Sequence, residues 1–491
     1  MTGNYTSNND RNIYAIYNLP EEVIAVLFAF YSRSKGSLRE NLQKMINDGN
    51  LFDEPNWVEV RLQLDEQVKE KLDQWLELRK FGTTEQAKNF HEKWVLNFGH
   101  ASCAEHSIIH LAIEEVSMLA AKAIEDCRLA SYTEKSTRYV VYDNIGFTTP
   151  SELSGMSKDI YKANCQDLID FYLKSHSTMS EKIKSQDPEL KPGQVRSKAC
   201  DICRNILPVS MHTNLGMTIN ARVLVRTIVK MLSSKNEEFI RVANQMKEEA
   251  LKVCPTLLKY TDKNDYIEKL DEKIKKHITT NSIDEQSKGI LKTNITEDEM
   301  LRKLVQSILL ERSQMPYDAA EKIACNSSVE TCQNILQHYC EGRSAHDDLL
   351  RVFEQVYLTH EIVVDFGAYR DIQRHRMNTQ ISQLLTPKLG YVVPDEFQGT
   401  DLELDFENKM KRSERIYYQI LVKTNDPKIA QYCLPMAFRK RVIFNWNLRE
   451  MSHFVNLRKR PTGHKNYIEV AKQIEQNFNS NFPFIGNLVF D

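Results

Sequence analysis

Arginine and histidine side chains gather at two places in the C-terminal half of the sequence. The first is a run that contains Arg370, Arg374, His375 and Arg376. Arg370 and Arg374 would share one face of a helix, and cations near a helix C-terminus also suit its dipole. The functional alternative is a phosphate clamp, because guanidinium groups bind phosphate oxygens in bidentate fashion. A second, partly aromatic cluster also favours an anionic ligand. Its basic members are Arg449, Arg458, Lys459, Arg460 and His464.

The first half of the chain offers a different set, in the segment LASYTEKSTRYVVY. Glu134, Ser136 and Arg138 alternate there, so in an extended loop their side chains would point the same way. An arginine and a serine hydroxyl suit a phosphate group, and a carboxylate suits a ribose hydroxyl or a ring N–H. An ordinary solvated loop is the alternative explanation for these three residues.

Two further groups of residues raise the question of a metal site. His100, Glu105, His106 and His110 lie close together in sequence, but their order is not H-E-x-x-H. A single CxxC pair ends at Cys203, and no two further ligands follow at a suitable spacing. We therefore expect no metal, and cysteines that are reduced structural thiols.

The elements that must position these residues are mostly helices. Long amphipathic stretches cover residues 21–45, 221–253 and 402–424, and short strands are expected at 107–113 and 357–364. The predicted fold class is α+β and helix-rich. The 491 residues are enough for about two to four domains.

Charge and hydropathy argue against several classes of protein. A formal net charge of -2 argues against a polycation that coats nucleic acid. The polar N-terminal segment lacks the pattern of a secretory signal, and the longest apolar run, at 23–30, is too short to span a bilayer. We expect a cytoplasmic protein without a membrane or nucleic-acid partner.

The two halves of the sequence resemble each other. LPVSMHTNLGMTINAR at 207–222 corresponds to LPMAFRKRVIFNWNLR at 434–449, with Leu-Pro, Asn and Arg at the same intervals. Upstream, each half has a predicted strand and then a helix, with a plausible N-cap at Ser117 or Asp365. A polar stretch separates the halves. The pattern predicts a duplication, with domains at 1–262 and 293–491 and a linker at 263–292.

These motifs together resemble the flavin-dependent thymidylate synthase (ThyX) family. Its signature RHRxxSxNExSxRY follows a segment like GHxSxxEH, and an LP…NAR…NLR region comes later. The first half has GHASCAEH and SYTEKSTRY, but Asp126 and Cys127 stand at the Arg-His positions and Met231 at the NLR arginine. The second half has RHR and the NLR arginine, Arg458, but lacks the ExSxR residues. The resemblance implies two tandem ThyX-like domains, each a small sheet packed by long helices.

The losses in the two halves are complementary. Arg204 matches a phosphate-binding arginine of the family, whereas Gln431 stands at its position in the second half. Family members are homotetramers whose sites are built across subunits. The resemblance therefore implies one composite site for each pair of unlike halves, in a homodimer that forms a pseudo-tetramer.

The resemblance also implies the reaction and the role of each residue. FAD would be the cofactor, NADPH and methylenetetrahydrofolate the co-substrates, and dUMP the substrate converted to dTMP. Arg458 would be the catalytic residue, against the uracil. Residues expected to hold dUMP are Glu134, Ser136, Arg138, Arg204 and Arg374. Residues expected to hold the flavin are Arg374, His375, Arg376, Asn447, Arg449, His453 and Ser102.

Two alternatives stay open. Asp371 stands where the family has a Gln beside the nucleotide, which allows C5-methylation of a different pyrimidine nucleotide. The loss of motif residues from both halves allows a non-catalytic nucleotide-binding protein.

Overall fold

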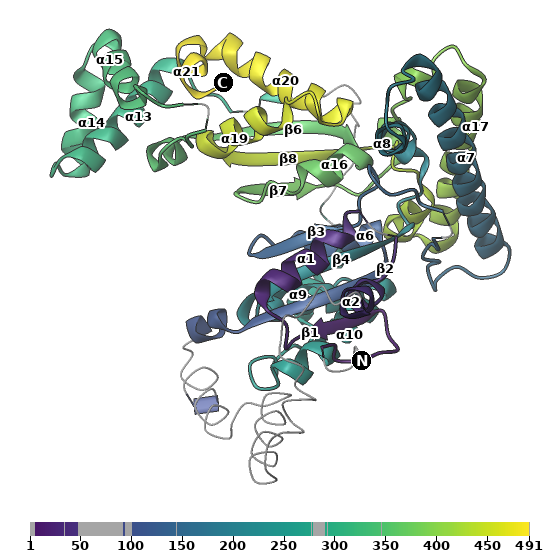
Figure 1. The fold of residues 1–491 in the computed structure, drawn as a ribbon. Coiled ribbons are helices and arrows are strands. Elements are labelled where there is room, and N and C mark those ends of the chain that lie inside the picture. The colour runs from purple at the N-terminus through teal and green to yellow at the C-terminus, as the bar shows by residue number, and fades with distance from the viewer. Residues whose placement is uncertain are drawn as a thin grey trace. The chain divides into compact units, whose positions relative to one another are not determined.

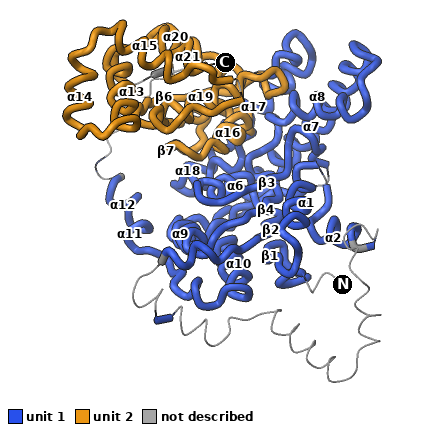
Figure 2. Tube along the Cα trace, turned by 60° about the vertical axis from the view of Figure 1, so that its left-hand side comes forward, with its two compact units in different colours: residues 1–280, 394–435 blue, residues 281–393, 436–491 orange. Residues whose placement is uncertain are grey.

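The computed structural model describes residues 5–33, 35–47, 92–93, 101–143, 145–275, 277, 290–291, 293–344 and 346–490 (Figure 1). His100 and residues 276, 278–289 and 292 of the expected linker lie outside these residues. The chain forms two compact units (Figure 2). Unit 1 comprises residues 1–280 and 394–435, and unit 2 comprises 281–393 and 436–491. Within the described ranges, no helix combines the length and hydropathy needed to cross a membrane.

Unit 1 contains a four-stranded antiparallel sheet. Its strands are β1 (Ile13–Ile16), β2 (Ile108–Ser117), β3 (Ala130–Glu134) and β4 (His212–Asn220), in the order β1-β2-β4-β3. β2 covers residues 108–113 of the strand predicted at 107–113 and continues beyond it through a bulge, where Glu115 has a φ of 55°. Alternate side chains of a strand point to opposite faces, so β2 serves two hydrophobic layers.

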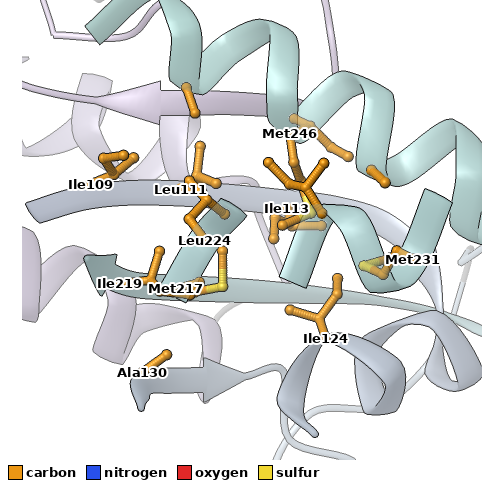
Figure 3. Close-up of a cluster of buried hydrophobic side chains, with 14 of the residues drawn as sticks. Ile109, Leu111, Ile113, Ile124, Ala130, Met217, Ile219, Leu224, Met231 and Met246 are labelled. Atoms are coloured by element: carbon orange, nitrogen blue, oxygen red, sulfur yellow. The ribbon is translucent and has the colours of Figure 1, made fainter. Parts of the chain in front are cut away.

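Helices cover both faces of this sheet. On one face, Ile109, Leu111 and Ile113 of β2 pack with side chains of α9 (Ala221–Leu232) and α10 (Glu237–Val253) (Figure 3). On the other face, β1 packs against α1 (Glu21–Tyr31) and α2 (Leu38–Asn47). Gly216 of β4 admits the ring of Phe28 from α1, since a Cβ there would lie 2.3 Å from that ring. The sheet and its two helical layers form the core of unit 1.

Two predicted long helices are each broken in the structure. The stretch at 21–45 forms α1 and α2, and the stretch at 221–253 forms α9 and α10. Between α9 and α10, Lys235 has a φ of 59° and the side chain of Asn236 caps α10 through the backbone N–H of Phe239. Short polar side chains that bond the backbone compete with helix continuation, which explains the break. Among its described residues, unit 1 also contains α6 (Met118–Glu125), α7 (Met156–Gln186), α8 (Pro192–Cys203), α11 (Asp265–Glu268), α12 (Leu270–Lys275), α17 (Asp401–Thr424) and α18 (Pro427–Ala430).

Unit 2 contains a second antiparallel sheet with the order β5-β6-β8-β7. Its strands are β5 (Ile290–Leu291), β6 (Tyr357–Asp365), β7 (Asn378–Ser382) and β8 (Arg439–Asn447). The helices in the described part of unit 2 are α13 (Glu297–Arg312), α14 (Tyr317–Asn326), α15 (Val329–Cys340), α16 (Phe366–Ile372), α19 (Leu448–Arg458), α20 (Lys465–Asn481) and α21 (Pro483–Val489). The two sheets and their helices confirm the predicted α+β class.

The two sheets repeat one another in register. Ile108 pairs with Asn220 in the first sheet, and Tyr357 pairs with Asn447 in the second. Asn220 and Asn447 each end a strand and cap the next helix, by accepting the N–H of Val223 and of Glu450. The predicted caps at Ser117 and Asp365 are present as well, through the N–H groups of Ala120 and Ala368. Matching registers and caps give an equivalence between the two repeats on either side of the bulge in β2, which adds one residue to the first repeat.

The compact units divide the chain at other points than the repeat does. α17, predicted at 402–424, lies in the second repeat but packs against α7 in unit 1. Asp167 of α7 accepts hydrogen bonds from Lys409 and Arg412 of α17, and Tyr432 donates to the buried carboxylate of Glu238 at 2.7 Å. The segment 394–435 therefore completes unit 1, and the proposed domain limits at 262 and 293 stay a prediction.

Candidate functional site

Two of the predicted phosphate-binding arginines meet at one carboxylate in unit 1. Arg138 donates to Asp201 in bidentate fashion, from Nε to Oδ1 at 2.7 Å and from Nη2 to Oδ2 at 3.0 Å. Nε of Arg204, on a side chain that is 2% exposed, lies 3.9 Å from the same Oδ1. Asp201 thus lies between two guanidinium groups, and its bidentate contact fixes the orientation of Arg138. The sequence analysis missed Asp201, although its i, i+3 spacing from Arg204 on a helix could have indicated it.

The loop after β3 is not extended, which corrects the expectation that Glu134, Ser136 and Arg138 point the same way. β3 ends at Glu134, and a turn begins within three residues. The buried carboxylate of Glu134 lies 3.1 Å from Nζ of Lys122 on α6. The hydroxyl of Ser136 instead accepts the backbone N–H of Arg138 at 3.1 Å, which shapes the turn. Glu134 and Arg138 therefore have separate partners, Lys122 and Asp201.

In unit 2, the structure brings the predicted His375 and Arg458 into direct contact. Nε of Arg458 donates to Nε2 of His375 at 2.9 Å, and Nη2 of Arg458 donates to the backbone carbonyl of Asp371 at 2.8 Å. The other ring nitrogen of His375, Nδ1, faces Oε1 of Glu450 at 3.6 Å. The ring of Phe454 packs edge-on against His375, with centroids 4.9 Å apart. Helix α19 supplies these three neighbours of the ring and also His453, whose ring centroid lies 5.8 Å from that of His375.

Burial shapes the electrostatics of this pair. His375 is 5% exposed, and burial lowers the pKa of its imidazole. Burial is also the largest influence on Arg458, where it lowers the pKa of the guanidinium. The ring of Tyr467 lies 5.2 Å from the Arg458 guanidinium carbon and offers a cation–π contact. The site thus holds a cation in partly dehydrated surroundings, where its field acts strongly.

A cavity of about 480 Å³ in unit 2 collects three of the predicted flavin residues. Asn447, at the end of β8, and Arg449 and His453, in the first and middle turns of α19, line it. Arg449 donates to Glu354 at 2.8 Å, as its repeat equivalent Arg222 does to Glu105. The sequence analysis missed other side chains of the wall. These are Arg343, His346, Asp347, Asp348, Leu349, Glu354, Met377, Glu450, Ser452, Asn456, Leu457 and Arg460.

The first arginine cluster differs from its predicted geometry. α16 ends at Ile372, so Arg374 lies in the turn beyond the helix and does not share a helical face with Arg370. Arg370 is buried at 3% exposure, whereas Arg374 is exposed and Arg376 is partly exposed. Only His375 of the RHR run turns inward. α16 ends before the chain turns into β7. The side-chain amides of Asn378 and Gln380 in β7 donate to the carbonyl of His375 and hold this turn.

The remaining predicted positions lie in unit 1. Ser102 is exposed on the 3-10 helix η3 (Ala101–His106), in a different unit from the other flavin candidates. His110 of β2 contacts Thr218 at 3.0 Å and Glu21 at 3.3 Å. Across the part of the chain that the structure describes, no group of His, Cys, Asp or Glu is arranged to hold a metal ion. Cys200 and Cys203 are buried free thiols, and burial raises the pKa of Cys200 to about 11.

Comparison with known proteins assigns the family. A family model described as thymidylate synthase complementing protein matches residues 57–256 and 299–484. The chain belongs to this family. A UPF0159 protein of Chlamydia muridarum is 31% identical over 96% of this chain and 91% of its own length. A UPF0159 protein of Thermoplasma acidophilum is 27% identical over 83% of this chain and 89% of its own length. A flavin-dependent thymidylate synthase of Clostridium tetani is 30% identical over 37% of this chain and 76% of its own length.

This member of the thymidylate synthase complementing protein family is a fused form with two family units, as the two separate matches show. The first repeat lacks the polar contacts that His375, Glu450 and Arg458 make in the second repeat. Counted from the caps, Met231 is equivalent to Arg458, Val223 to Glu450 and Cys127 to His375. Met231 and Val223 lie in the hydrophobic core of unit 1, and Cys127 packs against it. Apolar packing thus fills the first-repeat version of the His375–Arg458 site.

Proposed function

We propose that this chain is an enzyme that uses FAD to convert dUMP into dTMP, with methylenetetrahydrofolate as one-carbon donor and NADPH as reductant. The observation that carries the proposal is the hydrogen bond from Arg458 to the buried His375, joined through Glu450 to an arginine-lined cavity. The relatives described as flavin-dependent thymidylate synthases support the flavin and the pyrimidine nucleotide.

The side chains of unit 2 suit a flavin with its pyrophosphate. Arg343, Arg449 and Arg460 line the same cavity, and guanidinium groups match phosphate oxygens. Asn447 and His453 add donors and acceptors for the edges of a ring system. When bound, the flavin supplies the hydride that completes the methyl group. These residues would bind and orient the cofactor.

Arg458 is proposed to act on the substrate ring. As a cation it would stabilise the negative charge that develops on the uracil, which makes C5 a better nucleophile. Its hydrogen bonds to His375 and to the Asp371 carbonyl hold the guanidinium in place before substrate arrives. A preorganised charge needs little rearrangement in the transition state, and that is the source of its effect.

The arginine pair of unit 1 is proposed to bind the phosphate of dUMP. Asp201 orients Arg138 with two of the five donors of that guanidinium, and it neutralises part of the charge of the pair. Ser136 lies in the same turn and Glu134 at the end of the strand before it. We propose that unit 1 supplies residues for the phosphate and sugar of the nucleotide, and that unit 2 supplies most flavin-binding residues together with Arg374 and Arg458 for the nucleotide. That division of labour rests on the complementary motif losses in the sequence.

A direct assay tests the proposal. The full chain, loaded with FAD, is incubated with dUMP, methylenetetrahydrofolate and NADPH, and dTMP is measured by chromatography. Parallel reactions with dCMP and UMP test the second candidate function, which is C5-methylation of a different pyrimidine nucleotide. The buried position of Asp371 next to Arg458 favours this second function. Of the three nucleotides, only dUMP is expected to give a methylated product. Product from none of the three nucleotides would favour a non-catalytic nucleotide-binding protein.

The family resemblance extends the proposal to the setting of the enzyme. We propose that the chain acts in the cytoplasm as a homodimer. Light scattering of the FAD-loaded protein measures the assembly, and a mass equal to one chain would contradict the dimer.

A further inference from the structure

Three polar side chains of unit 2 form a continuous chain of contacts: Glu450, His375 and Arg458. Arg458 contacts Nε2 of the histidine ring at 2.9 Å, and Glu450 faces Nδ1 at 3.6 Å. His375 is 5% exposed and Glu450 is 9% exposed, so water has little access to either contact. Glu450 also lines the cavity, which makes it the link between the cavity and the buried ring.

The contact with Arg458 dictates where the histidine proton sits. An arginine side chain has only donors, so Nε2 of His375 must present its lone pair. A neutral imidazole then carries its single proton on Nδ1, the nitrogen that faces Glu450. A carboxylate at that position stabilises the Nδ1–H form over the other tautomer. Without it, the ring could turn its N–H toward Arg458, where donor would meet donor.

The first repeat provides an internal comparison for this group of three. Cys127, Val223 and Met231 stand at the positions of His375, Glu450 and Arg458. All three are packed in or against one hydrophobic core. Asn220 still caps the helix through the N–H of Val223, so the cap does not need a glutamate there. The carboxylate occurs in the repeat that has the histidine and the arginine, and the other repeat lacks all three.

We propose that Glu450 is a positioning residue, which fixes the Nδ1–H tautomer of His375 so that Nε2 can hold the Arg458 guanidinium in place. The catalytic consequence rests on the proposed function, whereas the tautomer does not. Carboxylates that orient a histidine bound to a metal typically change activity by about 10- to 100-fold when removed, and we expect an effect of similar size here. We expect Glu450→Val, which copies the first repeat, to lower kcat for dTMP formation by about that factor, with KM for dUMP nearly unchanged.

The deciding measurement is the ¹⁵N spectrum of the histidine rings in the full FAD-loaded chain, with His375→Gln identifying the His375 signals. In the unsubstituted protein, His375 should show a protonated Nδ1 and an unprotonated Nε2. Glu450→Val should shift the ring toward the Nε2–H form. Glu450→Gln should restore the Nδ1–H form, because its amide oxygen can still accept. Asp347→Asn is the matched control, since it removes another carboxylate of the cavity wall that instead binds Ser344.

Each result bears on one claim. An Nε2–H ring in the unsubstituted protein overturns the role of Glu450, even if Glu450→Val does not fold. An unchanged tautomer in Glu450→Val, or the same change in Asp347→Asn, overturns it as well. If the unsubstituted protein makes no dTMP but the ring responds as described, the proposed function fails and the positioning role stands.

Discussion

Pro208 and Pro435, which occupy the same position in the two repeats, form an antiparallel bridge with each other. The backbone N–H of Val209 donates to the carbonyl of Leu434 at 2.9 Å beside this bridge. The two Leu-Pro segments of the repeat thus meet within unit 1, next to the segment 394–435 that the second repeat contributes.

The stability of that arrangement should depend on Tyr432. Its buried hydroxyl donates to Glu238, whose carboxylate also accepts from Ser117 and Thr148. Tyr432→Phe removes one donor from a buried carboxylate, so the free energy of unfolding should fall by about 1–3 kcal/mol. Urea denaturation measures the loss. Tyr418→Phe, at an exposed position on α17, is the control, and an equal loss in both would contradict a special role for Tyr432.

Arg458→Ala should abolish turnover and leave FAD binding measurable. Removal of one charge-stabilising donor at a reacting ring costs about 100- to 1000-fold in rate. Met231, its first-repeat equivalent, is 2% exposed in a hydrophobic core. Met231→Leu keeps that volume and should cost less than about 1.5 kcal/mol in stability, with activity retained. Equal losses of kcat in the two variants would show that the repeats were assigned wrongly.

FAD should bind near one molecule per chain. Unit 2 holds the arginine-lined cavity and the His375–Arg458 pair, whereas the first repeat fills the equivalent positions with Cys127 and Met231. Fluorescence titration of the purified chain gives the stoichiometry directly. Saturation at two FAD per chain would refute a single flavin site per chain.

Arg138→Ala should weaken dUMP binding and leave FAD binding intact. A hydrogen bond to a charged group contributes about 1.5–3 kcal/mol, which corresponds to about a 10- to 150-fold change in the dissociation constant. Arg138→Lys should recover only part of the affinity, because an ammonium group cannot make the bidentate contact with Asp201. Calorimetry with the FAD-loaded protein measures both ligands, and a loss of FAD binding with dUMP binding unchanged would reverse the assignment.

The stability of the protein should show the titration of His375. Burial lowers its pKa in the folded protein, with Glu450, His453 and Arg458 as the charged or titratable groups that face it. The unfolded chain therefore takes up a proton below about pH 6.5 before the folded protein does. The stabilisation by neutral His375 is present above that pH and is lost as the pH falls toward the lowered value. Lowering the pH from 7.5 to 5 should therefore lower the melting temperature of the unsubstituted protein more than that of His375→Gln. Thermal unfolding at several pH values measures this, and an equal dependence of the melting temperature on pH in the two proteins would contradict it.

The sequence by itself determined the local elements and the duplication. Ser117, Asp365 and Asn447 could be recognised as caps or repeat landmarks because a cap acts on a backbone group only a few residues away. Strand alternation is equally local, so both central strands were predicted close to their true positions. The breaks in the helices at 21–45 and 221–253 were missed, because the amphipathic pattern continues through them while local polar side chains stop the helix.

Only the tertiary structure decided which side chains meet. Asp201 holds Arg138 and Glu450 faces His375 across long separations in sequence, and no spacing rule connects such residues. The inclusion of 394–435 in unit 1 likewise follows from the packing of α17 on α7. Packing also decided which neighbouring residues are buried. His375 is buried, which lowers the pKa of its imidazole, whereas Arg374, one residue earlier, is exposed. Contacts and dehydration arise when distant elements pack together, so they belong to the fold and not to any one segment of the chain.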